Sequence, residues 1–204
     1  MSVKHTLRLT LAGLALLVAA GGSAAKDLEV GNKAPDWSGI VGTDDKKHGL
    51  DEYKEAKVIV LAFVANHCPV AKAYQDRLIQ LQKDYGAKGV QVIAVNVNNL
   101  PADRLPAMKK RAKEKKYNFP YLYDPTQKIG HDYGAKVTPH VFILGKVTKE
   151  GREVEYIGAV DNNMKADKAD KHYVRDALDA LLAGKQPPVE ETKPFGCSVK
   201  YEKK

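Results

Sequence analysis

The sequence predicts a single-domain α/β fold with a central mixed β-sheet flanked by helices. Two observations support this prediction. Residues 57–65 and 90–97 are continuous apolar runs rich in β-branched residues, and a helical pattern follows each of them. Unbroken apolar runs are typical of strands that are buried on both faces of a sheet. The alternation of such strands with helices indicates βαβ units with right-handed crossovers.

Residues 1–25 have the composition of a secretory signal peptide. Lys4 and Arg8 come before or at the start of the largely apolar stretch 9–20, and small residues follow as far as Ala25. This stretch is too short to span a bilayer, which needs about 20 residues. We therefore expect cleavage after Ala25, export to the periplasm and no stable membrane anchor afterwards.

Length and composition fit one globular domain. Of 204 residues, 44% are apolar and 28% are charged, which excludes collagen-like, low-complexity and disulfide-dense classes. We assign residues 26–186 to the domain and residues 187–204 to a tail that carries Cys197. The net charge is +8, but basic runs such as residues 109–116 lack interleaved aromatic residues. Such runs are typical of solvated helix faces, so we expect no nucleic-acid partner.

The first half of the domain is predicted to contain two strand-helix pairs. Pro69 suits the first position of a helix, and apolar residues recur at helical spacing from Val70 to Tyr85, before Gly86. In chain order, we expect a lead-in with a short hairpin at residues 26–53, a strand at 57–65, a helix at 69–85, a strand at 90–97 and a helix at 103–116.

The second half is predicted to contain a β-hairpin and a last long helix. The turn at residues 149–151 separates two apolar runs, and Gly184 with the two prolines that follow it ends an apolar helical stripe. In chain order, we expect a short strand at residues 119–123, helical turns at 126–133, strands at 141–144 and 153–157, and a helix from about 173 to 182.

Cys68 is the leading candidate for chemistry. It lies between the first buried strand and its helix, at the carboxyl end of a strand, where open α/β sheets bind their ligands. Free amide groups and the partial positive charge of the helix N-terminus favour a thiolate there. The adjacent His67 could add a positive charge, although adjacency does not place its ring at the sulfur. The sequence therefore favours a reactive Cys68.

Two sequence segments resemble the thioredoxin-like superfamily. They are residues 66–71 (NHCPVA) after a strand, and residues 137–144 (VTPHVFIL) much later. In particular, the chain resembles exported redoxins and the peroxiredoxin-like group of alkyl hydroperoxide reductases and thiol-specific antioxidants. This resemblance implies a thioredoxin-like fold, a cis Thr138-Pro139 bond beside the reactive cysteine, and His140 near the same surface. It also implies a thiol-dependent oxidoreductase without a cofactor or metal.

The sequence also departs from these families. Ala71 stands where dithiol thioredoxins have their second cysteine, and Ala62 replaces their buried acid. Ala65 replaces the threonine that binds peroxide in typical peroxiredoxins, and their later arginine is missing as well. Arg152 is a weak candidate to replace it. Strong peroxidase activity is therefore in doubt.

Cys197 is a candidate resolving cysteine on a tail that can fold back. Cys68 would attack a peroxide or a substrate disulfide, and Cys197 would then close a Cys68-Cys197 bridge that an external thiol reductant reopens. The alternative is a structural disulfide. A bridge around a loop of about 130 residues stabilises a protein by about 4 to 5 kcal/mol in the chain-entropy model.

A third hypothesis is a copper-handling or partner-binding module without turnover. His67, His131 and His140 together with Cys68 could form a copper or zinc site, since imidazole and thiolate suit these metals. The closely spaced cysteine pair of copper-handling relatives is absent, and His48 and His172 are expected at the surface. Asp161 is expected in a turn.

Overall fold

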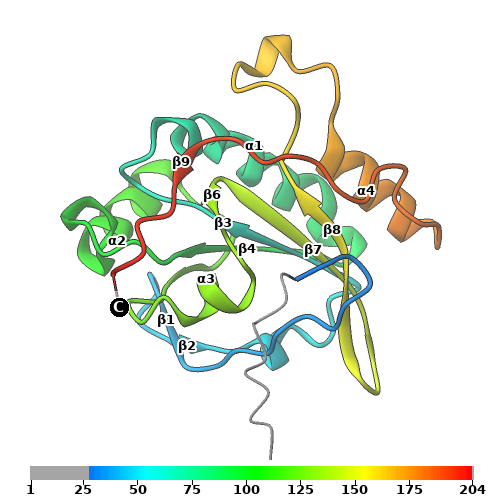
Figure 1. Ribbon diagram of the computed structural model, residues 1–204, viewed down its shortest axis with the longest axis horizontal. Helices are drawn as coiled ribbons and strands as arrows, with labels where there is room; N and C mark the ends of the chain where they lie inside the picture. Colours follow the sequence, from blue (N-terminus) through cyan, green and yellow to red (C-terminus); the bar gives the residue numbers. More distant parts are fainter. Residues whose placement is uncertain (1–27, 204) are drawn as a thin grey trace, which may run out of the picture.

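A computed structural model describes residues 28–203 of the chain. The predicted signal peptide, residues 1–25, lies outside the described residues. The main sheet has seven strands in the order β2-β1-β5-β4-β3-β7-β8 (Figure 1). Their bounds are Ile40–Gly42 (β1), Lys47–His48 (β2), Val58–Phe63 (β3), Val90–Asn96 (β4), Tyr121–Tyr123 (β5), His140–Thr148 (β7) and Gly151–Gly158 (β8). A further pair, β6 (Val137–Thr138) and β9 (Cys197–Ser198), forms a separate small sheet.

The sheet is mixed, as the sequence predicts. Strand β3 is parallel to β4, and β4 is parallel to β5. Strands β7 and β8 continue the sheet in antiparallel pairing on the other side of β3, and β1 pairs antiparallel with β5. The central position of β3 and β4 explains their apolar runs, because both faces of these strands are covered.

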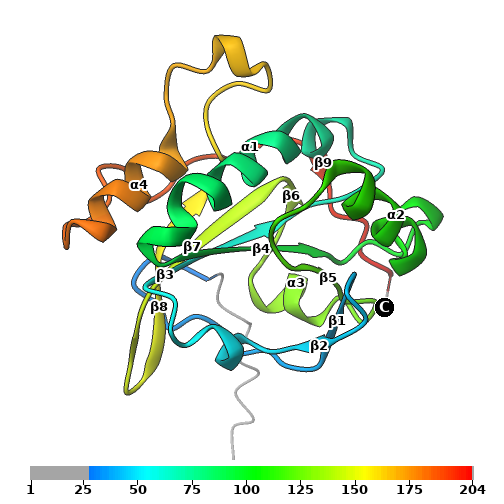
Figure 2. The same cartoon turned by 180° about the vertical axis from the view of Figure 1, so that it is seen from behind.

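Helices cover both faces of the sheet (Figures 1 and 2). The helices are α1 (Pro69–Tyr85), α2 (Leu105–Lys115), α3 (Lys128–Asp132) and α4 (Tyr173–Leu182), with short 3-10 helices at Leu50–Tyr53, Gly86–Lys88, Pro101–Asp103 and Ala166–Lys168. Side chains of α1, α2 and α4 pack in one hydrophobic cluster with Val58, Val60 and Ala62. The alternate residues Ile59, Leu61 and Phe63 pack in a second cluster with α3 and the lead-in. The structure thus confirms the predicted α/β fold with helices on both sides.

The outer edge of β8 is covered by segments from both ends of the described chain. The Gly31 and Ala34 amides donate to the carbonyls of Val154 and Arg152, each at 2.8 Å. Further along the strand, the Thr192 amide donates to the Ile157 carbonyl at 3.0 Å. The edge strand of the sheet is therefore already paired along much of its length.

The C-terminal tail contains a short strand, β9, which pairs antiparallel with β6. His48 is buried and not at the surface, since its ring nitrogens lie 3.0 Å from Asp44 and 3.1 Å from Glu52. None of the helices in residues 28–203 has the length and apolar character required to cross a membrane.

Candidate active site

Cys68 caps the N-terminus of α1. The Ala71 amide donates to the Cys68 Sγ at 3.3 Å. Pro69 occupies the first turn, where backbone N–H groups have no partner within the helix, so the missing N–H of proline costs no hydrogen bond. The helix therefore begins where the sequence predicts and presents a free amide to the sulfur. Such an amide, together with the helix dipole, stabilises a thiolate.

The Thr138-Pro139 peptide bond is cis and lies beside Cys68. The Cys68 thiol donates to the Thr138 carbonyl at 3.2 Å. The same Thr138 is the register partner of Cys197 across the β6-β9 pair. Residues far apart in the sequence thus bring both cysteines to one place.

The two thiols are neighbours, and their acidities differ. Burial raises the pKa of Cys68, but hydrogen bonds from the Ala71 amide and from the Cys197 side chain outweigh it, so the pKa lies below its usual value. Burial and the adjacent Cys68 sulfur raise the pKa of Cys197 above its usual value. Both cysteines are free thiols in this structure. Cys68 is therefore the sulfur that ionises first.

The C-terminal segment, residues 192–202, covers Cys68, and we call it the strap. Cys68 has no exposed surface, whereas Cys197 is half-buried. Phe195 packs edge-on against Tyr74 of α1, with ring centroids 6.0 Å apart. Gly196 lies so close to Thr138 that a Cβ atom there would be 2.0 Å from the Thr138 carbonyl oxygen. The strap thus packs against α1 and Thr138 beside a Cys68 side chain that is closed to solvent.

His67 turns its ring toward Asp103. The imidazole Nδ1 lies 2.6 Å from Asp103 Oδ2, and Asp103 is fully buried. The other carboxylate oxygen accepts from the backbone N–H of Asn66 at 2.6 Å and from the side-chain Nδ2 of Asn96 at 2.9 Å. Asp103 therefore fixes the loop that carries Cys68, and the sequence analysis missed it. Its only signal was its place soon after β4, at the sheet edge where Cys68 lies.

A comparison with known protein families identifies the family of this chain. A redoxin family profile matches residues 29–171. The chain belongs to the redoxin family. Its fold is thioredoxin-like. No curated protein matches the sequence significantly.

Solved structures resemble this redoxin to different extents. An uncharacterized conserved protein from Geobacillus kaustophilus is 34% identical, with a TM-score of 0.78, over 86% of this chain and 93% of the other. The thioredoxin domain of a thiol-disulfide oxidoreductase from Bacteroides vulgatus is 19% identical, with a TM-score of 0.52, over 65% and 91%. Peroxidoxin BcpB from Mycobacterium tuberculosis is 16% identical, with a TM-score of 0.60, over 77% and 97%. The last two likenesses concern the fold alone.

His140 of this redoxin is directed away from Cys68. Its ring packs on Phe142 at 4.6 Å, and Phe142 belongs to the cluster on the other face of the sheet. Burial, together with the nearby Lys136, lowers the pKa of His140 to about 4, so the ring is neutral at neutral pH. The resemblance implies that His140 lies near the Cys68 surface. In the structure, the His140 ring contacts Phe142 on the other face of the sheet from Cys68.

The histidines do not converge on Cys68. His131 stacks on Tyr201 at 4.1 Å, while His67 and His140 have the separate partners described above. Among residues 28–203, no three or more His, Cys, Asp or Glu side chains are grouped so that they could hold a metal ion.

Arg152 does not replace the missing arginine of peroxiredoxins. Its guanidinium donates to the carbonyls of Tyr53 at 2.8 Å and Ala56 at 2.7 Å, just before β3 begins. Cys68 follows the opposite end of β3, so the expectation that Arg152 serves this site is wrong. Arg152 instead ties the β7-β8 hairpin, near its turn, to the segment before β3.

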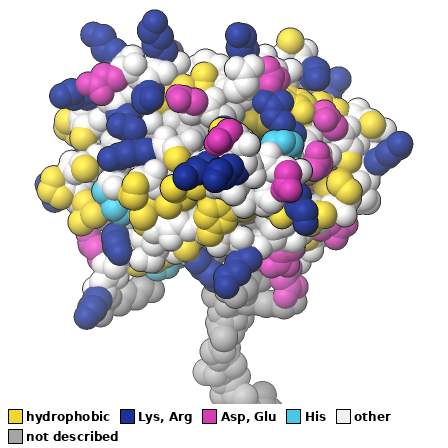
Figure 3. All heavy atoms as spheres, turned by 90° about the horizontal axis from the view of Figure 1, so that it is seen from above, with side chains coloured by type: hydrophobic (Ala, Val, Ile, Leu, Met, Phe, Trp, Pro, Cys, Tyr) yellow, Lys and Arg dark blue, Asp and Glu magenta, His cyan; other side chains and the backbone are white. Residues whose placement is uncertain are grey.

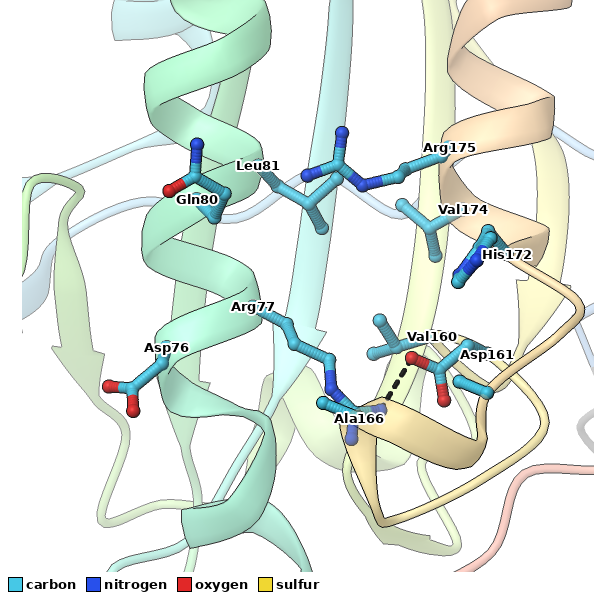
Figure 4. Close-up of a pocket in the computed structure, with 11 residues that line it drawn as sticks. Asp76, Arg77, Gln80, Leu81, Val160, Asp161, Ala166, His172, Val174 and Arg175 are labelled. Atoms are coloured by element: carbon cyan, nitrogen blue, oxygen red, sulfur yellow. Dashed lines mark hydrogen bonds and ion pairs between the residues drawn. The ribbon is translucent and has the colours of Figure 1, made fainter.

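Asp161 holds the loop after β8 against α1. It accepts from Tyr74 at 2.7 Å. It also accepts from Arg77 at 2.5 Å, the contact that Figure 4 marks with a dashed line. A cavity of about 310 Å³ lies beside this pair, between α1 and α4, with Val174 and Arg175 on its α4 side (Figure 4).

On the face drawn in Figure 3, Lys and Arg side chains are spread among acidic and apolar ones.

Proposed function

We propose that this redoxin is an exported thiol-dependent oxidoreductase in which Cys68 is the nucleophile and Cys197 is the resolving cysteine. One observation carries the proposal. Two free thiols lie side by side, and Cys68, which caps a helix, accepts the Ala71 amide hydrogen bond that favours a thiolate. A thiolate beside a thiol is the arrangement that thiol-disulfide exchange needs.

The reaction with a disulfide has two exchange steps. The Cys68 thiolate attacks one sulfur of the substrate and expels the other as a thiolate, which takes a proton from solvent. Cys197, once deprotonated, attacks Cys68 Sγ and expels the second substrate thiol, leaving the Cys68-Cys197 bridge. An external thiol reductant then supplies two electrons and two protons and restores both thiols.

A peroxide would follow a parallel route. Cys68 would attack the peroxide oxygen, release an alcohol or water and become a sulfenic acid, which Cys197 would convert to the bridge with loss of water. Ala65 stands where typical peroxiredoxins bind the peroxide, and Arg152 is engaged at the far end of β3. A disulfide is therefore the favoured substrate class.

The location is part of the proposal. A basic start, an apolar stretch and small residues before position 26 support export to the periplasm. An oxidising compartment allows a disulfide to persist between turnovers. N-terminal sequencing of the exported protein tests this. A chain that begins near Lys26 supports the proposal, and an intact Met1 in the cytoplasmic fraction contradicts it.

The decisive experiment compares the native protein with Cys68→Ser and Cys197→Ser. Insulin disulfides and hydrogen peroxide serve as substrates, and dithiothreitol serves as the reductant. We expect Cys68→Ser to abolish turnover. When the reductant is left out, Cys197→Ser should stop as a mixed disulfide with insulin or as a sulfenic acid with peroxide, and intact mass measurement detects both. Turnover that survives Cys68→Ser would overturn the proposal.

A further inference from the structure

The strap is held by its main chain on the far side of Cys197. The Lys200 amide donates to Asn98 Oδ1 at 2.8 Å. Gln127 Nε2 donates to the Lys200 carbonyl at 2.9 Å, and Gln127 Oε1 accepts from the Glu202 amide at 2.8 Å. Two side-chain amides thus make the hydrogen bonds that a neighbouring β-strand would make.

Both side chains are buried while the strap is in place. Asn98 has no exposed surface and Gln127 is 4% exposed. If the strap leaves, Gln127 keeps its bond to the Val97 carbonyl, at 2.7 Å, but loses both bonds to the strap. Hydrogen bonds that are shielded from water are stronger than hydrogen bonds to water, so the Asn98 and Gln127 side chains favour the closed strap.

Asn98 also connects the strap to the Cys68 loop. Its Nδ2 donates to Asn96 Oδ1 at 3.0 Å, and Asn96 Nδ2 donates to Asp103 Oδ1 at 2.9 Å. The same Asp103 oxygen accepts from the Asn66 amide, two residues before Cys68. One buried polar network therefore fixes the loop of one cysteine and the strap of the other.

We propose that Gln127 and Asn98 are positioning residues that clamp the strap over Cys68, and that substrate reaches Cys68 only when this clamp opens. The inference rests on the proposed function and extends it. The clamp has two opposite effects. It slows the first step, because a closed strap covers Cys68, and it speeds the second, because a closed strap returns Cys197 to Cys68.

The reagent 5,5′-dithiobis(2-nitrobenzoate), a small aromatic disulfide, separates the two steps. Attack by Cys68 forms a mixed disulfide and releases one coloured thiolate, and attack by Cys197 on that mixed disulfide releases the second. Stopped-flow absorbance therefore records both rates in one trace. Cys68→Ser and Cys197→Ser assign the phases to their sulfurs.

We expect Gln127→Ala to speed the first release about tenfold and to slow the second about tenfold, since two hydrogen bonds to the strap are lost. Asn99→Ala is the matched control. The Asn99 side chain also bonds to the strap, but through an exposed group: its Nδ2 donates to the Glu202 carboxylate at 2.7 Å. Both of its rates should stay within about twofold of native.

The outcomes are distinguishable. Two rates that are unchanged in Gln127→Ala, or that move in the same direction, overturn the clamp. If the native protein releases only one equivalent, the proposed function fails, and the first rate of Gln127→Ala in a Cys197→Ser background still tests the clamp. If Gln127→Ala does not fold, Gln127→Met decides, because it retains the length of the side chain and removes its polar atoms.

Discussion

The Cys68 sulfur combines full burial with a lowered pKa, and these properties normally oppose each other. Burial disfavours a thiolate because the charge loses its hydration. The Ala71 amide and the Cys197 thiol replace part of that hydration as fixed donors. The acidity of Cys68 therefore depends on two identifiable neighbours and not on exposure.

Cys197→Ala tests this dependence. Removing the thiol that hydrogen-bonds to Cys68 should raise the pKa of Cys68, because the thiolate loses one of its donors. The measurement is the pH dependence of the thiolate absorbance at 240 nm, which does not require reagent access. Cys197→Ser retains a donor and should shift the curve less. An unchanged curve in Cys197→Ala would contradict the assigned role.

His140 allows a second prediction at this scale. Its folded pKa of about 4 lies below its ordinary value of 6.5, so the unfolded chain binds a proton that the native protein excludes. Stability should therefore fall as pH drops below 6.5, and the contribution from His140 is about 2 kcal/mol between about pH 7.5 and pH 5.

The comparison uses His140→Phe, which has a ring that does not titrate. Urea unfolding at the two pH values should show a smaller loss of stability for this variant than for the native protein. Carboxylates titrate in both proteins, so the difference isolates His140. Equal losses would mean that His140 is protonated in the native state, against the burial described above.

At the scale of elements, β9 illustrates what sequence patterns do not reveal. Its two residues, Cys197 and Ser198, have no apolar alternation, and Pro and Gly precede them. The strand exists because β6 offers an edge and because Gly196 allows close approach. By contrast, β3 and α1 were predictable, since burial on both faces and helical spacing leave clear patterns in the sequence.

Gly196→Ala should detach the strap at its closest approach. The added Cβ would lie 2.0 Å from the Thr138 carbonyl oxygen. This oxygen belongs to the backbone, so no change of side-chain rotamer can relieve the clash. We expect proteolysis in residues 193–199 to increase about tenfold or more, as measured by mass spectrometry of limited digests.

Gly39→Ala is the matched control for that experiment. Gly39 also has a positive φ, 71°, but nothing lies within 4 Å of an added Cβ. This variant carries the same kind of backbone strain away from the strap. If both variants release the strap equally, general destabilisation and not the contact with Thr138 is responsible.

At the scale of the whole molecule, the chain order of strands and helices predicts the fold, whereas the site depends on contacts across the sequence. Cys68 was predictable because it lies at a strand-helix junction. Asp103 and Gln127 were not, since they act through partners 36 and 73 residues away. Buried polar side chains of this kind have no local periodicity, so single-sequence reasoning does not find them.

Bridge formation should stabilise the whole domain without rearranging it. The two sulfurs are already neighbours in the dithiol state, and the bridge would close a loop of about 130 residues. We expect the free energy of unfolding to rise by about 4 to 5 kcal/mol on oxidation. Guanidinium titrations of the oxidised and reduced protein measure the difference, with Cys197→Ser as the control that should not respond to the oxidant.

A smaller gain, or a loss, would mean that the closed bridge strains the strap. Such a strained bridge would be easily reduced, which suits turnover. A gain of the expected size is also what a purely structural disulfide would give. The reactivity of Cys68 is the measurement that distinguishes a catalytic bridge from a structural one.

The coverage of β8 affects how copies of this protein meet. A bare sheet edge presents amide and carbonyl groups on which another molecule can add a strand, a frequent first step toward fibrils. Here the main-chain groups of Arg152, Val154 and Ile157 already bond to residues 31–34 and 190–192 of the same chain. Self-association through this edge would require one of these segments to unpair first.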